Sequence, residues 1–269
     1  MMTSSTNIKR RAQSIRWVAK HWLLIFLVVY GLFNLLPFLA PVLMHAGWES
    51  GGNAVYTGYS GLCHQMAQRS FFMFGSDVML NADELPIQLS GNMGTDTLRL
   101  RQFRGNEDVG WKVAWSDRMV SMYGGVWLAA LAFAIIPPLR NRRRLSIFTF
   151  ILFVSPMAID GITHFMSDLS GLSEGFRYHN AWLATLTGHI FRNSFYVGDA
   201  LGSFNSWMRL VSGLLFGIGC VGLAFPYVEE YASEVTQYLT NKIDHLNALQ
   251  AHSEDYLKQL RNQSTSAKQ

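Results

Sequence analysis

A polar stretch of nine residues, LCHQMAQRS at 62–70, carries the side chains best suited to chemistry in this sequence. Cys63 supplies a thiol, His64 an imidazole, Gln65 an amide and Arg69 a guanidinium group. A cysteine beside a histidine has three interpretations. It is a thiolate nucleophile activated by the imidazole or the guanidinium group, a pair of metal ligands, or a buried polar turn in which the cysteine packs as a small apolar residue.

The metal interpretation needs more ligands, and a second polar pair offers them. Asp160 and His164 are four residues apart, so on a helix both side chains lie on one face. Thiolate, imidazole and carboxylate groups are the usual ligands of zinc and similar ions. We therefore take Cys63, His64, Asp160 and His164 as candidate ligands of a divalent metal ion, which is the possible cofactor.

Charged residues at the ends of apolar runs predict where this chemistry lies. Arg118 directly precedes one run and Arg209 lies at the start of another, while Asp160 is the sixteenth residue of a third, roughly 24 Å into a hydrocarbon core of about 30 Å. Charges at this depth persist mainly when they are paired or line a cavity. An aspartate with either arginine can lock helices together or form one wall of a polar pocket. The candidate polar site comprises ten residues: Cys63, His64, Gln65, Arg69, Arg118, Tyr123, Asp160, His164, Asn205 and Arg209.

The elements that must position these residues are membrane helices. Hydrophobic residues make up 49% of the 269 residues and charged residues only 15%, against roughly 25% charged in ordinary soluble domains. The apolar residues cluster in four runs, each close to the 20 residues or so that cross a bilayer. Only helices satisfy their own backbone there in a single segment. We predict an all-α membrane protein with spans at about 22–45, 119–139, 145–166 and 208–228.

Basic residues set the predicted orientation. Lys9, Arg10 and Arg11 stand in the juxtamembrane segment 1–21, and four arginines stand in the short connector 140–144. Because basic residues favour the cytoplasmic side, we expect both termini in the cytoplasm and both long connectors outside, in the inner membrane of a prokaryote. The first run is longer than the apolar core of a signal peptide, so we expect an uncleaved anchor. The net charge of +4 follows from this asymmetry and needs no nucleic acid.

The segments outside the spans differ in kind. We expect the outer insertion 46–117 to begin with a turn-rich piece, to place AQRSFFMFG in a short or re-entrant helix, and to contain a small β-meander formed by PIQL, TDTLRLRQF and GWKVAW. The second outer insertion, 167–206, is rich in Gly and Ser. Apolar residues recur at helical spacing over 229–260, which predicts a long cytoplasmic amphipathic helix. Residues 261–269 have the composition of a disordered tail.

The polar motifs together resemble a known pattern. CHQ with RS, then SDRMVSMYGG, AIDGITHF and NSWMRLVSGLLFG occur in this order. The set resembles a family of small multi-pass prokaryotic membrane proteins classed as a domain of unknown function, with the pattern CHQxxxRS, CxRCxGxYxG, DGxTQ and NxxRxxTGxxxG. The positions that match are Cys63, His64, Gln65, Arg69, Ser70, Arg118, Tyr123, Gly125, Asp160, Gly161, Thr163, Asn205, Arg209, Gly213 and Gly217.

The sequence also departs from that pattern. The two cysteines of its second motif fall on Ser116 and Met119, and its glutamine falls on His164. A site with four thiolate-type ligands is therefore not expected. Either His164 substitutes as a ligand, or this copy has lost a metal or redox function and serves as a subunit of a complex.

We predict an integral membrane protein whose extracytoplasmic Cys/His/Asp/Arg site binds a metal ion or a small anionic molecule. The residues do not decide whether it is an enzyme. One alternative is a non-catalytic structural or assembly subunit of a larger membrane complex, and a second is an oligomeric transporter. Besides the lipid bilayer, the expected partners are further copies or other subunits, bound through the Gly213/Gly217 face and the 229–260 helix.

Overall fold

A computed structural model describes residues 2–140 and 144–266 of the chain. It contains two compact units, one formed by residues 27–225 and the other by the described residues before and after them. Each unit is described by itself. Arg142 and Arg143 of the predicted basic connector lie outside the described residues.

Four helices are long and apolar enough to cross a membrane, which confirms the predicted fold class. They are α2 (Trp22–His45), α5 (Asp117–Ile135), α7 (Ile147–Asp168) and α11 (Phe204–Ser266). The helix α2 continues through Pro37 and Pro41.

The ends of α5 and α7 follow local rules. Pro137 and Pro138 stop α5 after Ile135, four residues before the predicted end, because proline has no N–H and restricts the residue before it. The short helix α6 (Pro137–Arg140) follows. Ser146 caps α7 by accepting a hydrogen bond from the Thr149 amide at 3.1 Å. Gly161 does not interrupt α7, so Asp160 and His164 share one buried face as predicted.

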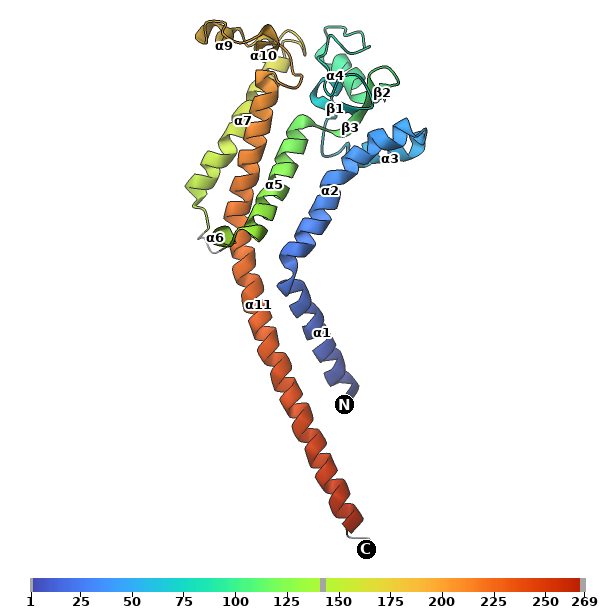
Figure 1. Cartoon of the computed structure of the whole chain (residues 1–269), viewed down its shortest axis with the longest axis vertical. Coiled ribbons are helices and arrows are strands. Elements are labelled where there is room, and N and C mark those ends of the chain that lie inside the picture. The colour runs from blue at the N-terminus through green and yellow to red at the C-terminus, as the bar shows by residue number, and fades with distance from the viewer. Residues whose placement is uncertain (1, 141–143, 267–269) are drawn as a thin grey trace. The chain divides into compact units, whose positions relative to one another are not determined.

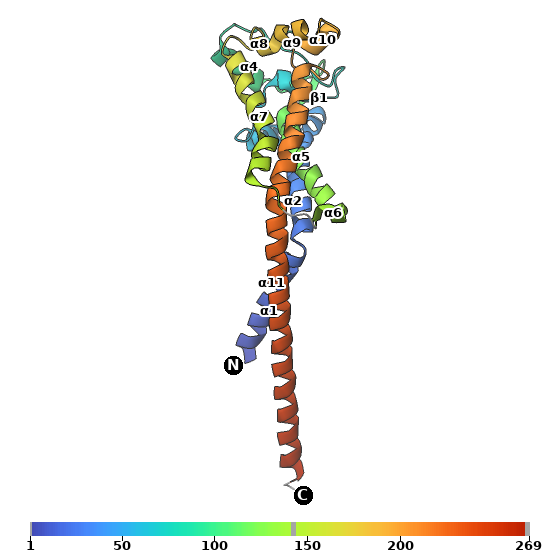
Figure 2. The ribbon, with the colours of Figure 1, turned by 90° about the vertical axis from the view of Figure 1, so that its left-hand side faces the viewer.

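Helices α5, α7 and the first part of α11 lie side by side in both views (Figures 1 and 2). Gly213 and Gly217 of α11 face α5 so closely that an added Cβ atom would lie 2.4 Å from the Ser121 hydroxyl and 2.2 Å from the Gly125 backbone. The predicted small-residue face therefore does allow a close helix approach. Its partner is α5 of the same chain, so this face is covered.

The first insertion contains a three-stranded antiparallel sheet of order β1-β3-β2. Its elements are α3 (Glu49–Tyr59), the 3-10 turn η1 (Ala67–Arg69), β1 (Ser70–Met73), α4 (Met93–Gln102), β2 (Gly105–Asn106) and β3 (Gly110–Ser116). Ser70 pairs with Ser116, and Phe72 pairs with Lys112 after a bulge. Of the expected strands, only GWKVAW is one.

Three local predictions in this insertion are wrong. Much of the expected turn-rich piece is the helix α3, and the expected helix AQRSFFMFG is helical only over the 3-10 turn η1 and continues as the strand β1. The segment TDTLRLRQF belongs to α4, because Asn92 caps the helix start by accepting from the Thr95 amide. The alternating leucines suggested a strand, but Leu98 is exposed and only Leu100 is buried.

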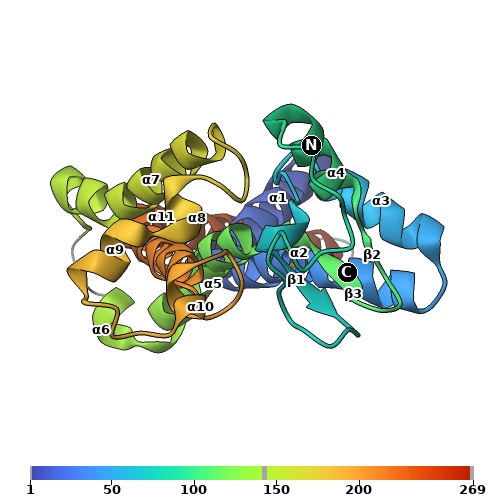
Figure 3. The ribbon, with the colours of Figure 1, turned by 90° about the horizontal axis from the view of Figure 1, so that it is seen from above.

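The second insertion folds into three short helices, α8 (Phe176–His179), α9 (Ala181–Leu186) and α10 (Asn193–Tyr196). Seen from above, these helices lie over α7 and α11, whereas the small sheet, α3 and α4 lie beside them (Figure 3). Leu183, Ala184 and Tyr196 form a small apolar core between the short helices. The insertions thus lie at the end of the spans where α5 and α11 begin and α7 ends.

The second unit is a pair of helices from the two ends of the chain. Helix α1 (Met2–Lys20) packs with the later part of α11 around Ala12, Leu239 and Ile243. Lys9 donates to Gln250, and Arg16 lies 3.5 Å from the Thr240 hydroxyl. The amphipathic stripe is therefore partly covered within the chain. Helix α11 is continuous from the fourth span through Pro226 to Ser266, so residues 261–266 are helical rather than disordered, and 267–269 lie outside the described residues.

Candidate functional site

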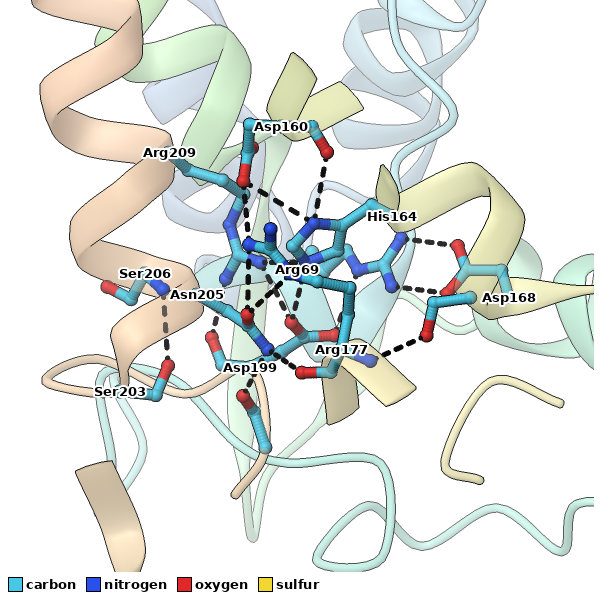
Figure 4. A network of polar contacts seen from close by, with 12 residues as sticks. Arg69, Asp160, His164, Asp168, Arg177, Asp199, Ser203, Asn205, Ser206 and Arg209 are labelled. Carbon is cyan, nitrogen blue, oxygen red and sulfur yellow. Dashed lines mark hydrogen bonds and ion pairs between the residues drawn. The ribbon is translucent and has the colours of Figure 1, made fainter. Parts of the chain in front are cut away.

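The polar side chains at this end of the spans form one network of charges and hydrogen bonds (Figure 4). It contains four arginines and four aspartates, and it divides into two groups. We call the first the Asp199 cluster, made of Arg69, Asp117, Asp168, Asp199 and Arg209. We call the second the Asp160 cluster, made of Arg118, Asp160 and Arg177.

In the Asp199 cluster, two guanidinium groups are fully engaged. Arg69 donates both terminal nitrogens to Asp168 at 2.8 Å and its Nε to Asp199 at 2.9 Å. Arg209 donates to the Asp117 carboxylate at 2.5 Å, to the Asp199 carboxylate at 2.8 Å and to the Asp199 backbone oxygen at 2.7 Å. Bidentate and charge-assisted contacts of this kind are among the strongest polar contacts in proteins.

In the Asp160 cluster, one carboxylate accepts from two arginines. Arg118 contacts one oxygen at 2.6 Å and Arg177 the other at 2.8 Å. The predicted pairing of Asp160 with Arg118 is therefore present. The alternative pairing of Asp160 with Arg209 is absent, because Arg209 binds Asp117 and Asp199. Arg177 of α8 contacts the second oxygen of Asp160 instead.

His164 joins the two clusters. Its Nδ1 lies 3.2 Å from the Asp160 backbone oxygen, and its Nε2 lies 3.3 Å from an Arg209 nitrogen and 3.5 Å from Asp199. Its Nδ1 also lies 3.5 Å from an Asp160 carboxylate oxygen, and the imidazole is 2% exposed.

The two clusters carry opposite excess charge. The Asp160 cluster has two guanidinium groups for one carboxylate, and the Asp199 cluster has three carboxylates for two guanidinium groups. The whole network is neutral, but each part is one charge away from balance. Burial alone would raise the pKa of Asp199, yet Arg69 and Arg209 hold that pKa well below its usual value. Burial likewise opposes the charge of Arg69, and Asp199 and Asp168 outweigh it to raise the pKa of Arg69.

The CHQ stretch is held by a strained residue and a buried lysine. Gln65 has a positive φ of 54°, which is uncommon for a residue other than glycine. Its side-chain amide donates to the Tyr56 backbone oxygen at 2.9 Å and accepts from Arg104 at 3.0 Å. Lys112 of β3 is fully buried and donates to the backbone oxygen of Gln65 at 2.6 Å. These contacts compensate the strain.

Lys112 also donates to the backbone oxygens of Leu100 and Arg101, at 3.3 and 2.8 Å. Burial lowers the pKa of Lys112 well below its usual value, and the positive charge of Arg104 adds to this effect. The three carbonyl oxygens replace the water that Nζ loses on folding. Lys112 thus ties the CHQ turn to α4 and β3.

The strained turn fixes the positions of Cys63 and His64. The Cys63 sulfur accepts from the amides of Gln65 and Ser116 at 3.2 and 3.3 Å, and it is 6% exposed within an apolar core. His64, the next residue, is exposed. The two side chains therefore diverge rather than converge on one point.

A cavity of about 280 Å³ lies between the CHQ stretch and the network. Seven of the ten predicted site residues line it: Cys63, His64, Gln65, Arg69, Arg118, His164 and Arg209. The other three lie elsewhere. Asp160 lies behind Arg118, and Asn205 donates to the backbone oxygens of Arg177 and Gly198, bracing α8 on α11. Tyr123 stacks on Trp115 at 4.7 Å between ring centres, in an aromatic cluster.

The predicted metal site is not formed. Among the residues that the structure describes, no group of three or more His, Cys, Asp or Glu side chains is placed to hold a metal ion. Cys63 is occupied by backbone amides and Asp160 by two guanidinium groups. His64 is exposed, whereas Cys63 and Asp160 are buried. The predicted ligands Cys63, His64, Asp160 and His164 therefore do not form such a group.

Four charged members of the network were missed from the sequence: Asp117, Asp168, Arg177 and Asp199. Asp168 had a usable signal, because Asp160, His164 and Asp168 follow at four-residue intervals on one face of α7. Asp117 adjoins Arg118 in the first turn of α5. Arg177 and Asp199 had none, since each stands in a connector whose path depends on the tertiary fold.

Comparisons with known proteins agree with a membrane protein and assign no role. Residues 108–223 match a family described as "Predicted membrane protein (DUF2085)". The chain is 29% identical over 176 residues to "Uncharacterized protein MJ1492" of Methanocaldococcus jannaschii, which covers 62% of this chain and 88% of that protein. No solved structure matches. The family match includes the network residues of α5, α7, α8 and α11, and it begins after the CHQ stretch.

Proposed function

We propose that this membrane protein binds a small molecule through an anionic group, in the cavity beneath the CHQ stretch. One observation carries the proposal. Arg118 lines the cavity, belongs to the cluster with an excess positive charge, and still has hydrogen-bond donors to offer. A carboxylate or phosphate group at Arg118 would neutralise that excess.

The donors of Arg118 support this assignment. Among the described residues, its one carboxylate partner is Asp160, contacted through a single terminal nitrogen. Its Nε is buried without a hydrogen-bond partner in the described part of the chain. An arginine nitrogen left unpaired in a buried site is costly. The same planar group recognises carboxylate and phosphate oxygens in pairs.

The position of the cavity supports a ligand from outside the cytoplasm. The N-terminal segment and the described part of the connector 140–144 are basic, which favours the cytoplasm for the opposite ends of the spans. The cavity then opens on the extracytoplasmic side of a prokaryotic inner membrane. Impermeant labelling of the thiol introduced by His64→Cys in intact spheroplasts, but not of the thiol introduced by Arg10→Cys, is the expected result.

The charge preference of the cavity can be measured with a reporter thiol introduced by His64→Cys, because His64 is exposed and lines the cavity. In a background with Cys63→Ser and Cys220→Ser, this thiol is modified with two methanethiosulfonates of similar size, one bearing a sulfonate and one a trimethylammonium group. We expect the sulfonate reagent to react faster, and inorganic phosphate to slow it. Because a charge-assisted hydrogen bond contributes about 1.5–3 kcal/mol, Arg118→Gln should lower the ratio of the two rates by about tenfold.

The control for that measurement is Arg192→Gln. Arg192 is exposed in the second insertion, 167–206, and does not line the cavity, so its loss removes one positive charge without touching the site. The ratio should stay near that of the parent. Equal rates for the two reagents in the parent protein, or an equal fall in both variants, would contradict an anion site at Arg118.

A second candidate function is assembly with further subunits. The α1/α11 pair exposes large apolar side chains on faces that do not contact each other, including Ile15 and Val18 on α1 and Tyr231, Tyr238 and Leu249 on α11. Exposed apolar faces of this kind commonly mark interaction sites. Deleting residues 229–269 should reduce the particle size on native gels by more than the mass removed. A loss equal to the deleted mass would argue against assembly through this segment.

A further inference from the structure

We infer that the ligand is an amphiphile, a membrane lipid whose anionic phosphate headgroup binds at Arg118 and whose hydrocarbon chain leaves along α7. This inference rests on the proposed anion site and adds the source and class of the ligand. A free phosphate ion would share the headgroup chemistry, so the experiment below separates the two.

The cavity has two chemically different walls. The polar wall carries Arg69, Arg118 and Arg209 with their partners. The rest of the lining is largely apolar, with Leu62, Met66, Met93, Met119, Phe165 and Leu172. Three of these six are methionines, which fit flexible apolar groups of variable shape. Apolar side chains would make no favourable contact with a free hydrophilic ion.

The apolar wall continues onto a surface that faces the bilayer. Phe165 lines the cavity and is also 60% exposed. Ile162, Met166 and Leu169 are 57–61% exposed on the same helix, which is one of the four candidate spans. Leu62, on the CHQ side of the cavity, is 48% exposed. An apolar chain can therefore pass from the cavity to the lipid-facing side of α7 without crossing a polar surface.

The depth of Arg118 matches a lipid headgroup. Arg118 stands in the first turn of α5, and Phe165 lies in the last turn of α7. Both are therefore near the level where hydrocarbon gives way to the polar headgroup region. Basic residues at that level attract anionic lipids. The volume of about 280 Å³ suits a headgroup and the start of a chain rather than a complete lipid.

The charges favour an anionic headgroup over a zwitterionic one. Asp168 accepts two hydrogen bonds from Arg69, and Asp117 accepts from Arg209 and from the Arg118 backbone amide. These carboxylates already have cationic or N–H partners, so they do not require the amine of a zwitterionic headgroup. Among the described arginines of the network, Arg118 is the one with a buried nitrogen, Nε, that has no hydrogen-bond partner. A phosphate diester with no compensating cation, as in phosphatidylglycerol, fits this pattern.

The test uses the full chain in nanodiscs, with Cys63→Ser and Cys220→Ser and with the reporter thiol of His64→Cys. The rate of alkylation of this thiol by N-ethylmaleimide is measured in pure phosphatidylcholine, after adding phosphatidylglycerol, and after adding inorganic phosphate to the same molar amount. We expect phosphatidylglycerol to slow alkylation at least fivefold and phosphate to have less than a twofold effect. Arg118→Gln should abolish the protection, whereas Arg192→Gln should retain it.

The apolar route is tested at Phe165. Phe165→Asn should reduce the protection by phosphatidylglycerol at least threefold, and Phe165→Leu should retain it. Protection by phosphate as strong as that by the lipid would overturn the lipid inference while keeping the anion site. If neither phosphate nor lipid protects the reporter thiol and the sulfonate reagent shows no advantage, the anion site itself is wrong.

Discussion

Arg118 and Arg209 are the same residue type, close to the starts of the neighbouring helices α5 and α11, yet their environments differ. Arg209 is 1% exposed, and each of its three nitrogens donates to an oxygen of Asp117 or Asp199. The Arg118 side chain is 22% exposed and meets one carboxylate. A buried ion pair contributes little net stability unless every partner is satisfied. The comparison therefore assigns Arg209 to holding the helices together and Arg118 to binding.

The clusters around these two arginines follow the same division. The Asp199 cluster ties four separate segments, because its members come from the CHQ side, α5, α7 and the start of α11 with its preceding connector. The Asp160 cluster has one excess positive charge and adjoins the cavity. One network can thus serve as a structural lock on one side and as a receptor for an anion on the other.

We expect the largest difference in the free energy of unfolding between Arg209→Gln and Arg118→Gln. Removing Arg209 leaves two buried carboxylates without that partner, and we expect a loss of about 3–5 kcal/mol in the free energy of unfolding. Arg118→Gln removes one contact and an excess charge, so we expect about 1–2 kcal/mol. Unfolding of both variants by SDS titration from detergent micelles measures the difference. Equal losses would remove the distinction between lock and binding group.

The next effect depends on which carboxylate is neutralised. Asp160→Asn leaves two buried guanidinium groups without a carboxylate, and we expect a cost of about 3 kcal/mol. Asp168→Asn brings the Asp199 cluster to zero net charge and should cost only about 1–2 kcal/mol, from the weakened contact with Arg69. Thermal midpoints in one detergent give the order of the two variants. A larger loss for Asp168→Asn would contradict the proposed division of charge.

A smaller effect is expected from acid. The pKa of Asp199 is lower in the folded protein than in the unfolded chain, because Arg69 and Arg209 favour its carboxylate despite burial. Its stabilisation is therefore fully present above the unfolded pKa of about 4 and is lost as the pH falls through the folded value. The thermal midpoint of the parent should be level from about pH 7 to 5 and fall below about pH 4. Asp199→Asn should start lower and show a shallower acid fall.

The smallest effect should come from His164→Gln. Glutamine can accept from Arg209 through its oxygen and donate to Asp160 through its nitrogen, so it can keep the contacts at both ring nitrogens. We expect a change below about 1 kcal/mol, whereas His164→Leu should cost about 1–3 kcal/mol because two buried polar contacts lose their partner. Chemical unfolding of both variants tests this. A glutamine variant as unstable as the leucine variant would show that these two contacts do not account for the contribution of His164.

The sequence alone predicts structure correctly where one physical effect dominates. Four uncharged or nearly uncharged runs of about 20 residues predicted four helices, since a hydrocarbon layer permits little else in one segment. The depth of Arg118, Asp160 and Arg209 followed from counting residues along those helices. The pairing of Asp160 with Arg118, and the shared face of Asp160 and His164, followed in turn.

In the insertions, sequence patterns alone did not predict the correct helices and strands. The segment TDTLRLRQF alternates like a strand but is a helix, because an Asn92 cap and burial of Leu100 outweigh the alternation. The strand β1 pairs with β3, which lies about 40 residues further along the chain. In such segments the local preferences are small, so contacts with distant residues decide the outcome.

The residues by themselves determined that this chain crosses a membrane and carries polar groups at one level of it, because the cost of burying charge in hydrocarbon is large and depends on position along a helix. Tertiary structure alone decided which charges meet. Arg177 and Asp199 reach the network from irregular connectors, and Cys63 faces backbone amides instead of a metal. Those outcomes depend on the path of the backbone between helices, which no spacing in the sequence encodes.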